Sequence, residues 1–492
     1  MSQPSIKKNF IFRALYELLV LITPFITTPY VARVLGSEGA GIASYTGSVM
    51  AFFTMAATLG TPVYGMREVA RNRDNPQEAS RIFWEIELLT FITSGIALAA
   101  WMGVCAGWKE YRIYFLALTP TLLSTMFDIS WFFTAYEKVG YTVARNAFFK
   151  ILGVVLLLTL VKSRDDLVLS IFLTAVTGML GSLSMWSFLP KLIVRVDLRT
   201  LSIRRHFRQT LVYFIPTIAT TISAVLDKFL LGLIIHDYSL SGYYAHANKL
   251  MGIVNSLAFN ALFSVMYPRV SYLFAQNRTE DIKRHISRAM DFSLLLGTGC
   301  VFGVAGVAHV FVPVFWGPGW EPVETLLYLM GPITIIVSVS YCLGSLYYTP
   351  SGNRAQSTRY VMIDAAINSA LNLLLIPRWN AYGAVAATLV AEGITTVLYM
   401  RNCRGYLTWG TLWRCCRKRF PAGAAMGALV MAIGRIPMES GLLKLALQIP
   451  AGVLFYAGVL YLAKDETLKE GLRIVKEACR RAAGILRGDG AT

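Results

Sequence analysis

Two adjacent charged residues, Asp227 and Lys228, lie inside an apolar stretch of membrane length. FIPTIATTI precedes the segment SAVLDKFLLG that contains them, and LIIHDY follows it. A charge at the bilayer centre costs about 2.5–3.5 kcal/mol on insertion scales, so such residues normally face a bundle interior or a wet cavity. Lysine in such a place suits an anion such as a phosphate group. A carboxylate there balances charge or binds a coupling cation.

Three cations on different apolar stretches form the candidate binding site. Asp227 and Lys228 project about 100° apart on a helix, so each needs a partner on another helix, or water. Lys249 lies at a depth similar to that of Lys228, and Arg33 lies near the outer end of its own stretch. We expect these three cations to line one outward cavity. The alternative is a set of separate structural ion pairs, or side chains that reach the membrane surface.

Further polar residues recur at helical spacing within apolar stretches. Asp364, Asn368 and Asn372 form one stripe at i, i+4 and i+8, and Asn260 shares the face of Lys249. Such stripes bind a polar ligand or join helices to each other, and both interpretations stay open. Glu17 and Asp128 lie nearer the inner side, where they could couple to an ion or balance charge.

The composition defines the class of protein that must position these residues. The chain of 492 residues is 55% hydrophobic and 15% charged, whereas a soluble protein carries about 25% charged residues. We therefore expect an all-α integral membrane protein with about fourteen spanning helices. They are predicted near residues 10–35, 41–63, 82–107, 112–135, 141–161, 167–190, 210–235, 242–267, 291–316, 322–349, 359–377, 381–402, 421–436 and 442–463.

The distribution of positive charge predicts the orientation. Of the 46 Lys and Arg residues, 36 fall on the side that holds both termini and eight on the other. Such a bias places both termini in the cytoplasm. The net charge of +18 then faces anionic lipid rather than a nucleic acid.

Five short segments recur in the same order, which indicates a six-span duplication. Gly41 to Tyr45 parallels Gly242 to His246, for example. Copies of six spans share one orientation and should be related by an axis along the membrane normal. The predicted domains are a six-span bundle, a basic cytoplasmic linker, a second six-span bundle, two additional spans and a basic amphipathic cytoplasmic tail. They cover residues 1–190, 191–209, 210–404, 405–463 and 464–492.

Motifs for catalysis are missing from the sequence. It contains no G-x-x-x-x-G-K-[ST] phosphate loop and no H-E-x-x-H pair, and no loop is long enough for a hydrolase or polymerase site. We therefore expect neither an enzyme nor a bound cofactor or metal. The polar residues inside the membrane are therefore the remaining candidates for a functional site.

Several segments resemble the polysaccharide repeat-unit flippases, the O-antigen, capsule and exopolysaccharide members of the multidrug/oligosaccharidyl-lipid/polysaccharide exporter superfamily. The resemblance rests on PFITTPYVARVLGSEGAGIASY with YGMREVAR, on the D-x-x-W-F-F core from Asp128 to Phe133, and on LDKFLLG with SGYYAHANKL. YGAVAATLVAE, from Tyr382 to Glu392, resembles the twelfth span of that family.

This resemblance implies two pseudo-symmetric six-helix bundles in a V shape plus two C-terminal spans, in the bacterial inner membrane. It implies alternating access that moves undecaprenyl diphosphate-linked oligosaccharide from the inner to the outer leaflet. The lysines and Arg33 would meet the diphosphate, and the polar stripes would meet the sugar. Protons or sodium are the candidate coupling ions, and a polysaccharide polymerase or glycosyltransferases are candidate partners. A lipid II flippase and an ion-coupled multidrug antiporter of the same superfamily are the alternatives.

Overall fold

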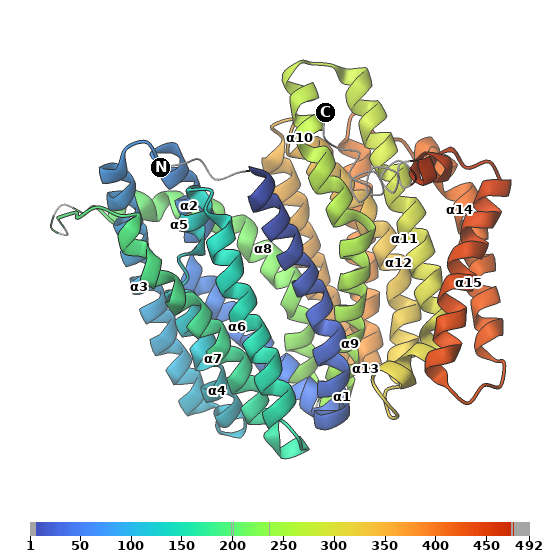
Figure 1. The fold of residues 1–492 in the computed structure, drawn as a ribbon, viewed down its shortest axis with the longest axis horizontal. Coiled ribbons are helices and arrows are strands. Elements are labelled where there is room, and N and C mark those ends of the chain that lie inside the picture. The colour runs from blue at the N-terminus through green and yellow to red at the C-terminus, as the bar shows by residue number, and fades with distance from the viewer. Residues whose placement is uncertain (1–5, 198, 200, 236, 474–475, 477–492) are drawn as a thin grey trace, which may run out of the picture. The chain divides into compact units, whose positions relative to one another are not determined.

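The described chain is built from helices. The computed structural model describes residues 6–197, 199, 201–235, 237–473 and 476, and this part contains no strand (Figure 1). The all-α membrane fold predicted from the sequence is thereby confirmed. The α-helices are α1 (Ile6–Thr58), α2 (Thr61–Arg71), α3 (Pro76–Gly107), α4 (Arg112–Met126), α5 (Ser130–Ala135), α6 (Val139–Leu160), α7 (Leu167–Met185), α8 (Arg204–Ile234), α9 (Tyr238–Asn255), α10 (Ala261–Ala275), α11 (Thr279–Phe315), α12 (Pro322–Leu343), α13 (Arg354–Asn402), α14 (Trp409–Gly434) and α15 (Gly441–Leu462).

Two of these helices are too long for one membrane crossing and are broken in the middle. A hydrocarbon core about 30 Å thick needs about 20 helical residues, whereas α1 has 53 and α13 has 49. The backbone of α1 is non-helical at Gly36 (φ 72°) and that of α13 at Asn380 (φ 52°). Both φ values are positive, a conformation that glycine adopts freely and asparagine tolerates. Each break divides its helix into two arms of membrane length.

The number of membrane-length helices agrees with this division. In the described residues, ten helices are long and apolar enough to cross a membrane, or eleven if the bent pair α9 and α10 forms one span. Counting both arms of α1 and α13 separately, and adding the bent pair and α14, gives the fourteen segments that the sequence predicts. The first half of α14 carries Arg414, Arg417, Lys418 and Arg419, and this charge keeps α14 out of the ten.

The chain divides into two compact units. Unit 1 holds Met1–Ala245 and Ser369–Ala384, and unit 2 holds His246–Asn368 and Val385–Thr492. In unit 1, α8 packs along α1. The domain boundaries and the cytoplasmic termini expected from the sequence stay predictions. Most of the predicted amphipathic tail, residues 474–475 and 477–492, lies outside the described residues.

Large side chains fill the core of each unit. In unit 1, one cluster surrounds Phe83, Phe132 and Phe133, and a second surrounds Tyr45 and Trp101. In unit 2, α11 packs on α12, α14 and α15, as the yellow and red helices of Figure 1 show.

A buried arginine joins three segments of unit 2. Arg419 of α14 is 2% exposed and donates to the carboxylates of Asp291 at 3.1 Å and Asp465 at 3.2 Å. It also donates to the Thr467 hydroxyl at 2.9 Å. These contacts compensate the guanidinium charge, and they hold α14 against α11 and the segment after α15.

Two glycines permit a reciprocal backbone contact between α1 and the start of α9 in unit 1. A Cβ atom on Gly41 would lie 1.8 Å from the carbonyl oxygen of Tyr238, and one on Gly242 would lie 2.1 Å from that of Ser37. Gly41 and Gly242 are matched positions of the predicted duplication. A contact in which each copy presents the same position to the other is typical of two-fold related elements. The contact therefore supports the duplication.

We predict that Gly41→Ala and Gly242→Ala each lower the melting temperature of the purified protein. The new methyl group must push the two backbones apart, and overpacking costs about 1–3 kcal/mol. Gly47→Ala and Gly252→Ala are matched controls on the same two helices, because a Cβ atom there would meet nothing within 4 Å. Equal melting temperatures for the two sets of variants would contradict the proposed close contact.

Candidate functional site

Asp227 of α8 is buried and bound by two neighbouring helices of unit 1. Only 5% of the surface of this residue is exposed. The Tyr244 hydroxyl of α9 donates to its Oδ2 at 2.5 Å, and the Asn372 amide of α13 donates to its Oδ1 at 2.6 Å. Short hydrogen bonds of this kind are typical of a charged acceptor. They compensate the loss of water around Asp227 and join α8, α9 and α13.

Lys228 is half-buried beside this carboxylate. Consecutive helical residues point about 100° apart, so Lys228 projects away from the direction of Asp227. No side chain in the described part of the chain forms a salt bridge with Lys228, and the charge that acts on it through space is that of Asp227. Because Tyr244 and Asn372 hold Asp227, the lysine ammonium keeps donors for a further anion.

The other two predicted cations are exposed. Arg33 is in α1 of unit 1, whereas Lys249 is in the part of α9 that belongs to unit 2. Each has electrostatic or hydrogen-bonding neighbours of its own. The cavity expected to unite them with Lys228 therefore stays a prediction.

The polar stripe on α13 is buried and forms contacts within the protein. Asp364 is 7%, Asn368 3% and Asn372 0% exposed. In unit 2, the Asn368 amide donates to the Thr388 hydroxyl at 3.1 Å, and the Thr395 hydroxyl donates to Asp364 at 3.4 Å. These bonds join the two arms of α13, the structural role that such stripes often have in membranes.

The remaining predicted residues belong to other helices and turns. Glu17 of α1 is exposed, and Asp128 is exposed at the turn between α4 and α5. Asp128 accepts the backbone N–H of Ser130 at 2.9 Å and lines a cavity of about 140 Å³ in unit 1. Asn260 ends a π-helical turn, Ser256–Asn260, and its side chain lies outside the described part of the structure. The described residues contain no cluster of side chains suited to a metal ion.

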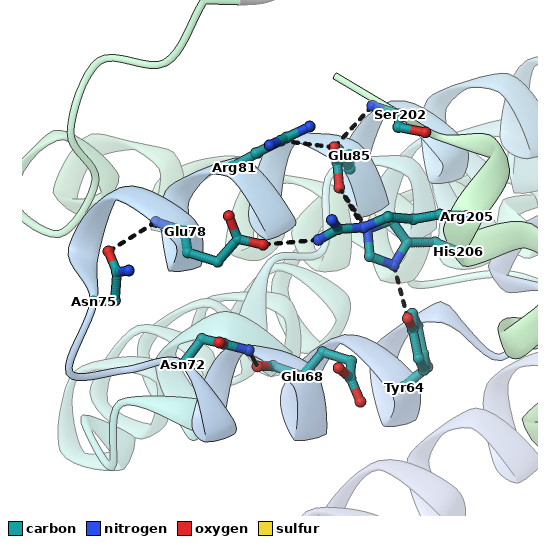
Figure 2. Close-up of polar contacts among 10 residues, drawn as sticks. All are labelled: Tyr64, Glu68, Asn72, Asn75, Glu78, Arg81, Glu85, Ser202, Arg205 and His206. Carbon is teal, nitrogen blue, oxygen red and sulfur yellow. Dashed lines mark hydrogen bonds and ion pairs between the residues drawn. The ribbon is translucent and has the colours of Figure 1, made fainter. Parts of the chain in front are cut away.

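Sequence reasoning missed a buried ionic cluster around Glu85, drawn in Figure 2. Glu85 of α3 is 0% exposed and accepts the backbone N–H of Ser202 at 2.8 Å. It also pairs with Arg81 at 3.1 Å, Arg205 at 3.2 Å and His206 at 2.6 Å. We call Tyr64, Glu85, Arg205 and His206 the α8 anchor.

The α8 anchor fastens the start of α8 to α2 and α3. In a neutral His206, Nε2 donates to Glu85 and Nδ1 accepts the Tyr64 hydroxyl, 2.7 Å away. Arg205 also reaches Glu78 at 2.9 Å. The linker and the first turn of α8 are thereby fixed, and this sets the position of Asp227 and Lys228 farther along the same helix. The acidic residues within the apolar run IFWEIELLTF were the visible signal for this cluster.

Solved structures show which fold this is. The lipid II flippase MurJ, in an inward closed conformation, matches with a TM-score of 0.64 and 16% identity over 93% of this chain and 99% of that one. The MATE multidrug transporter DinF-BH matches with a TM-score of 0.55 and 16% identity over 85% of this chain and 97% of that one. The chain therefore has the fold of these multi-pass membrane transporters.

Sequence comparison assigns the family. The family model described as "Polysaccharide biosynthesis protein" matches residues 6–274, more than half of the chain. The "Putative O-antigen transporter" of Escherichia coli (strain K12) is 20% identical over 406 residues, which cover 81% of this chain and 97% of that protein. The chain belongs to the polysaccharide biosynthesis protein family, and the resemblance found in the sequence is confirmed. The matched proteins are named as transporters, as expected of a chain without catalytic motifs.

We predict that Glu85→Ala lowers the melting temperature and exposes the linker at residues 191–209 to trypsin. Removal of one partner from a buried ionic cluster costs about 3–5 kcal/mol, because the remaining charges lose their compensation. Glu68→Ala is the control on the neighbouring helix, since Glu68 pairs with the exposed Arg71 at 3.2 Å, a contact worth about 0–1 kcal/mol. Equal cleavage of the two variants would show that the α8 anchor does not hold the linker.

Proposed function

We propose that this protein flips undecaprenyl diphosphate-linked oligosaccharide repeat units from the inner to the outer leaflet of the bacterial inner membrane. Membership of the polysaccharide biosynthesis family and the transporter fold support this proposal. The observation that carries it is Lys228. This half-buried lysine forms no salt bridge in the described chain, although it lies next to a carboxylate.

A diphosphate head group suits this arrangement. Its oxygens accept strong charge-assisted hydrogen bonds from an ammonium group. Asp227 would compete for Lys228 if its oxygens were free, but the Tyr244 hydroxyl and the Asn372 amide bind one oxygen each. We propose that Lys228 binds the diphosphate, together with Lys249 and Arg33, and that Asn260, Asn368 and Asn372 contribute to sugar contacts.

Transport by alternating access fits a lipid-linked substrate. The lipid tail stays in the bilayer, and the head group crosses through the protein. No phosphate loop is present in the sequence, so an ion gradient or consumption of the product on the outer side supplies the driving force. We propose that Asp227, Glu17, Asp128 and Asp364 balance charge or exchange the coupling ion. A polysaccharide polymerase or glycosyltransferases would act on the same lipid-linked glycan.

We predict that the double variant with Lys228→Ala and Lys249→Ala produces no surface polysaccharide when its gene replaces the wild-type gene in the host. The head group then loses two of its three proposed cations, and lipid-linked repeat units accumulate inside. Lys109→Ala is the matched control, because Lys109 is exposed at the start of a short helix, Lys109–Tyr111. Wild-type polysaccharide from the double variant, at normal protein abundance, would refute the cationic site.

A further inference from the structure

The cavity beside Asp128 in unit 1 is walled mainly by polar side chains. Its volume is about 140 Å³. Four threonines, one serine and one aspartate line it, together with Pro62 and Trp131. Pockets for drug-sized molecules measure about 300–1,000 Å³. This cavity therefore suits one small ring rather than a whole oligosaccharide.

Two interrupted helices end at this cavity. α1 ends at Thr58 and α4 ends at Met126, just before Asp128. The short helices α2 and α5 begin after these breaks, at Thr61 and Ser130, and pack against each other. A helix C-terminus carries about half a negative charge. The cavity therefore disfavours a phosphate group and favours a neutral or positively charged ligand.

The threonine hydroxyls of the wall donate their hydrogens to backbone carbonyl groups three or four residues earlier in the chain. The bonds are Thr58 to Met55 at 2.9 Å, Thr61 to Thr58 at 2.7 Å, Thr90 to Ile86 at 3.0 Å and Thr125 to Thr121 at 3.1 Å. A hydroxyl group has one hydrogen and two lone pairs. The wall therefore offers mainly acceptors, and a ligand that fits it must supply hydrogen-bond donors.

Asp128 adds a carboxylate to this set of acceptors. Its Oδ1 accepts the backbone N–H of Ser130 at 2.9 Å, which fixes the side chain at the turn. A carboxylate has two oxygens and about four lone-pair sites, so Asp128 can also accept from two neighbouring hydroxyl groups of one ligand. Asp128 is the one acid in this wall. Because neutral acceptors outnumber the charge, a ligand with many hydroxyl groups fits better than a cation.

The apolar part of the wall is rigid. Phe83 stacks on Trp131 with the ring centroids 5.7 Å apart. On α2, a Cβ atom at Gly65 would lie 2.7 Å from the indole ring of Trp131, so the backbone of α2 approaches this ring closely. Small-molecule sites combine apolar and aromatic walls with a few placed polar groups. Trp131 and Pro62 can contact the C–H groups of a sugar ring while its hydroxyl groups meet the acceptors.

We propose that this cavity binds one sugar unit of the lipid-linked glycan. Asp128 accepts from neighbouring hydroxyl groups of the ring, and Thr90 and Thr125 accept from others. With the orientation predicted from the sequence, Asp128 lies nearer the inner side, from which the proposed substrate enters. The inference rests on the proposed function and deepens it, because it names a sugar subsite in unit 1 and gives Asp128 a definite role there.

Saturation-transfer NMR on the full-length protein in lipid nanodiscs tests the cavity without any transport. The probes are glucose, galactose, rhamnose and N-acetylglucosamine, with choline as a cation and inorganic phosphate as an anion. We expect at least one sugar to bind, and we expect equal concentrations of choline or phosphate to leave it bound. Binding of none of the sugars, or displacement of the bound sugar by either ion, would overturn the proposal.

Two variants place the bound sugar. Asp128→Asn should weaken its binding about tenfold, because hydrogen bonds to a charged acceptor are lost. Asp197→Asn is the matched control, since Asp197 is exposed and accepts the backbone N–H two residues later, at 2.9 Å, as Asp128 does. Thr90→Val should also weaken binding. Its control is Thr159→Val, because the Thr159 hydroxyl is exposed and donates within its own helix at 2.8 Å. Unchanged affinity in either cavity variant would overturn the proposal.

A transport assay separates this inference from the proposed function. In proteoliposomes that contain undecaprenyl diphosphate-linked sugar at limiting concentration, Asp128→Asn should translocate the head group more slowly than the wild type, and Asp197→Asn should match the wild type. Equal rates for Asp128→Asn and the wild type would overturn the sugar subsite and leave the flippase intact. A wild type that translocates nothing would refute the proposed function instead, while the NMR result still decides whether the cavity binds a sugar.

Discussion

The two hydrogen bonds to Asp227 are the interaction on which the proposed site depends. No water is available in the bilayer core, so a buried carboxylate must find donors within the protein. Tyr244 and Asn372 supply one donor each, from α9 and α13. They fix three helices of unit 1 at one point, and the proposed site requires that Lys228, next to this bound carboxylate, meets the ligand. The same carboxylate therefore serves both the packing of unit 1 and the proposed chemistry of the site.

Two glutamates on α3 are equally buried but have different surroundings. Glu85 is bound by two arginines, a histidine and a backbone N–H, and it anchors the start of α8. Glu87 is equally buried and has no such partner. A compensated acid adds to the rigidity of its surroundings, whereas an isolated buried acid is costly to ionise.

Much of the fold follows from the sequence, because the bilayer fixes the length and polarity of its segments. Apolar runs of membrane length predicted the helices, and the common order of five matched segments predicted the duplication that the contact between Gly41 and Gly242 supports. The break at Asn380 falls between the predicted spans 359–377 and 381–402, but its positive φ was not predicted, since a single asparagine does not reveal that conformation.

The site was predicted less completely than the fold. Asp227 and Lys228 stand out because charges are rare in apolar runs, and the α13 stripe stands out because its spacing is helical. Their partners were not predictable, since Tyr64 and His206, or Asp227 and Asn372, are far apart in the chain and meet only in the folded protein. Glu85 and Glu87 were visible as acids, but one sequence cannot show that one of them is bound and the other is not.

The most direct measurement is head-group translocation by the wild-type protein in proteoliposomes. Undecaprenyl diphosphate-linked oligosaccharide, lipid II and a cationic dye would be offered in parallel, with protein-free liposomes as the baseline. We expect the linked oligosaccharide to cross at a rate well above the baseline and the dye to stay. Transport of lipid II alone, or of the dye alone, by a well-folded protein would contradict the assignment as a flippase of polysaccharide repeat units.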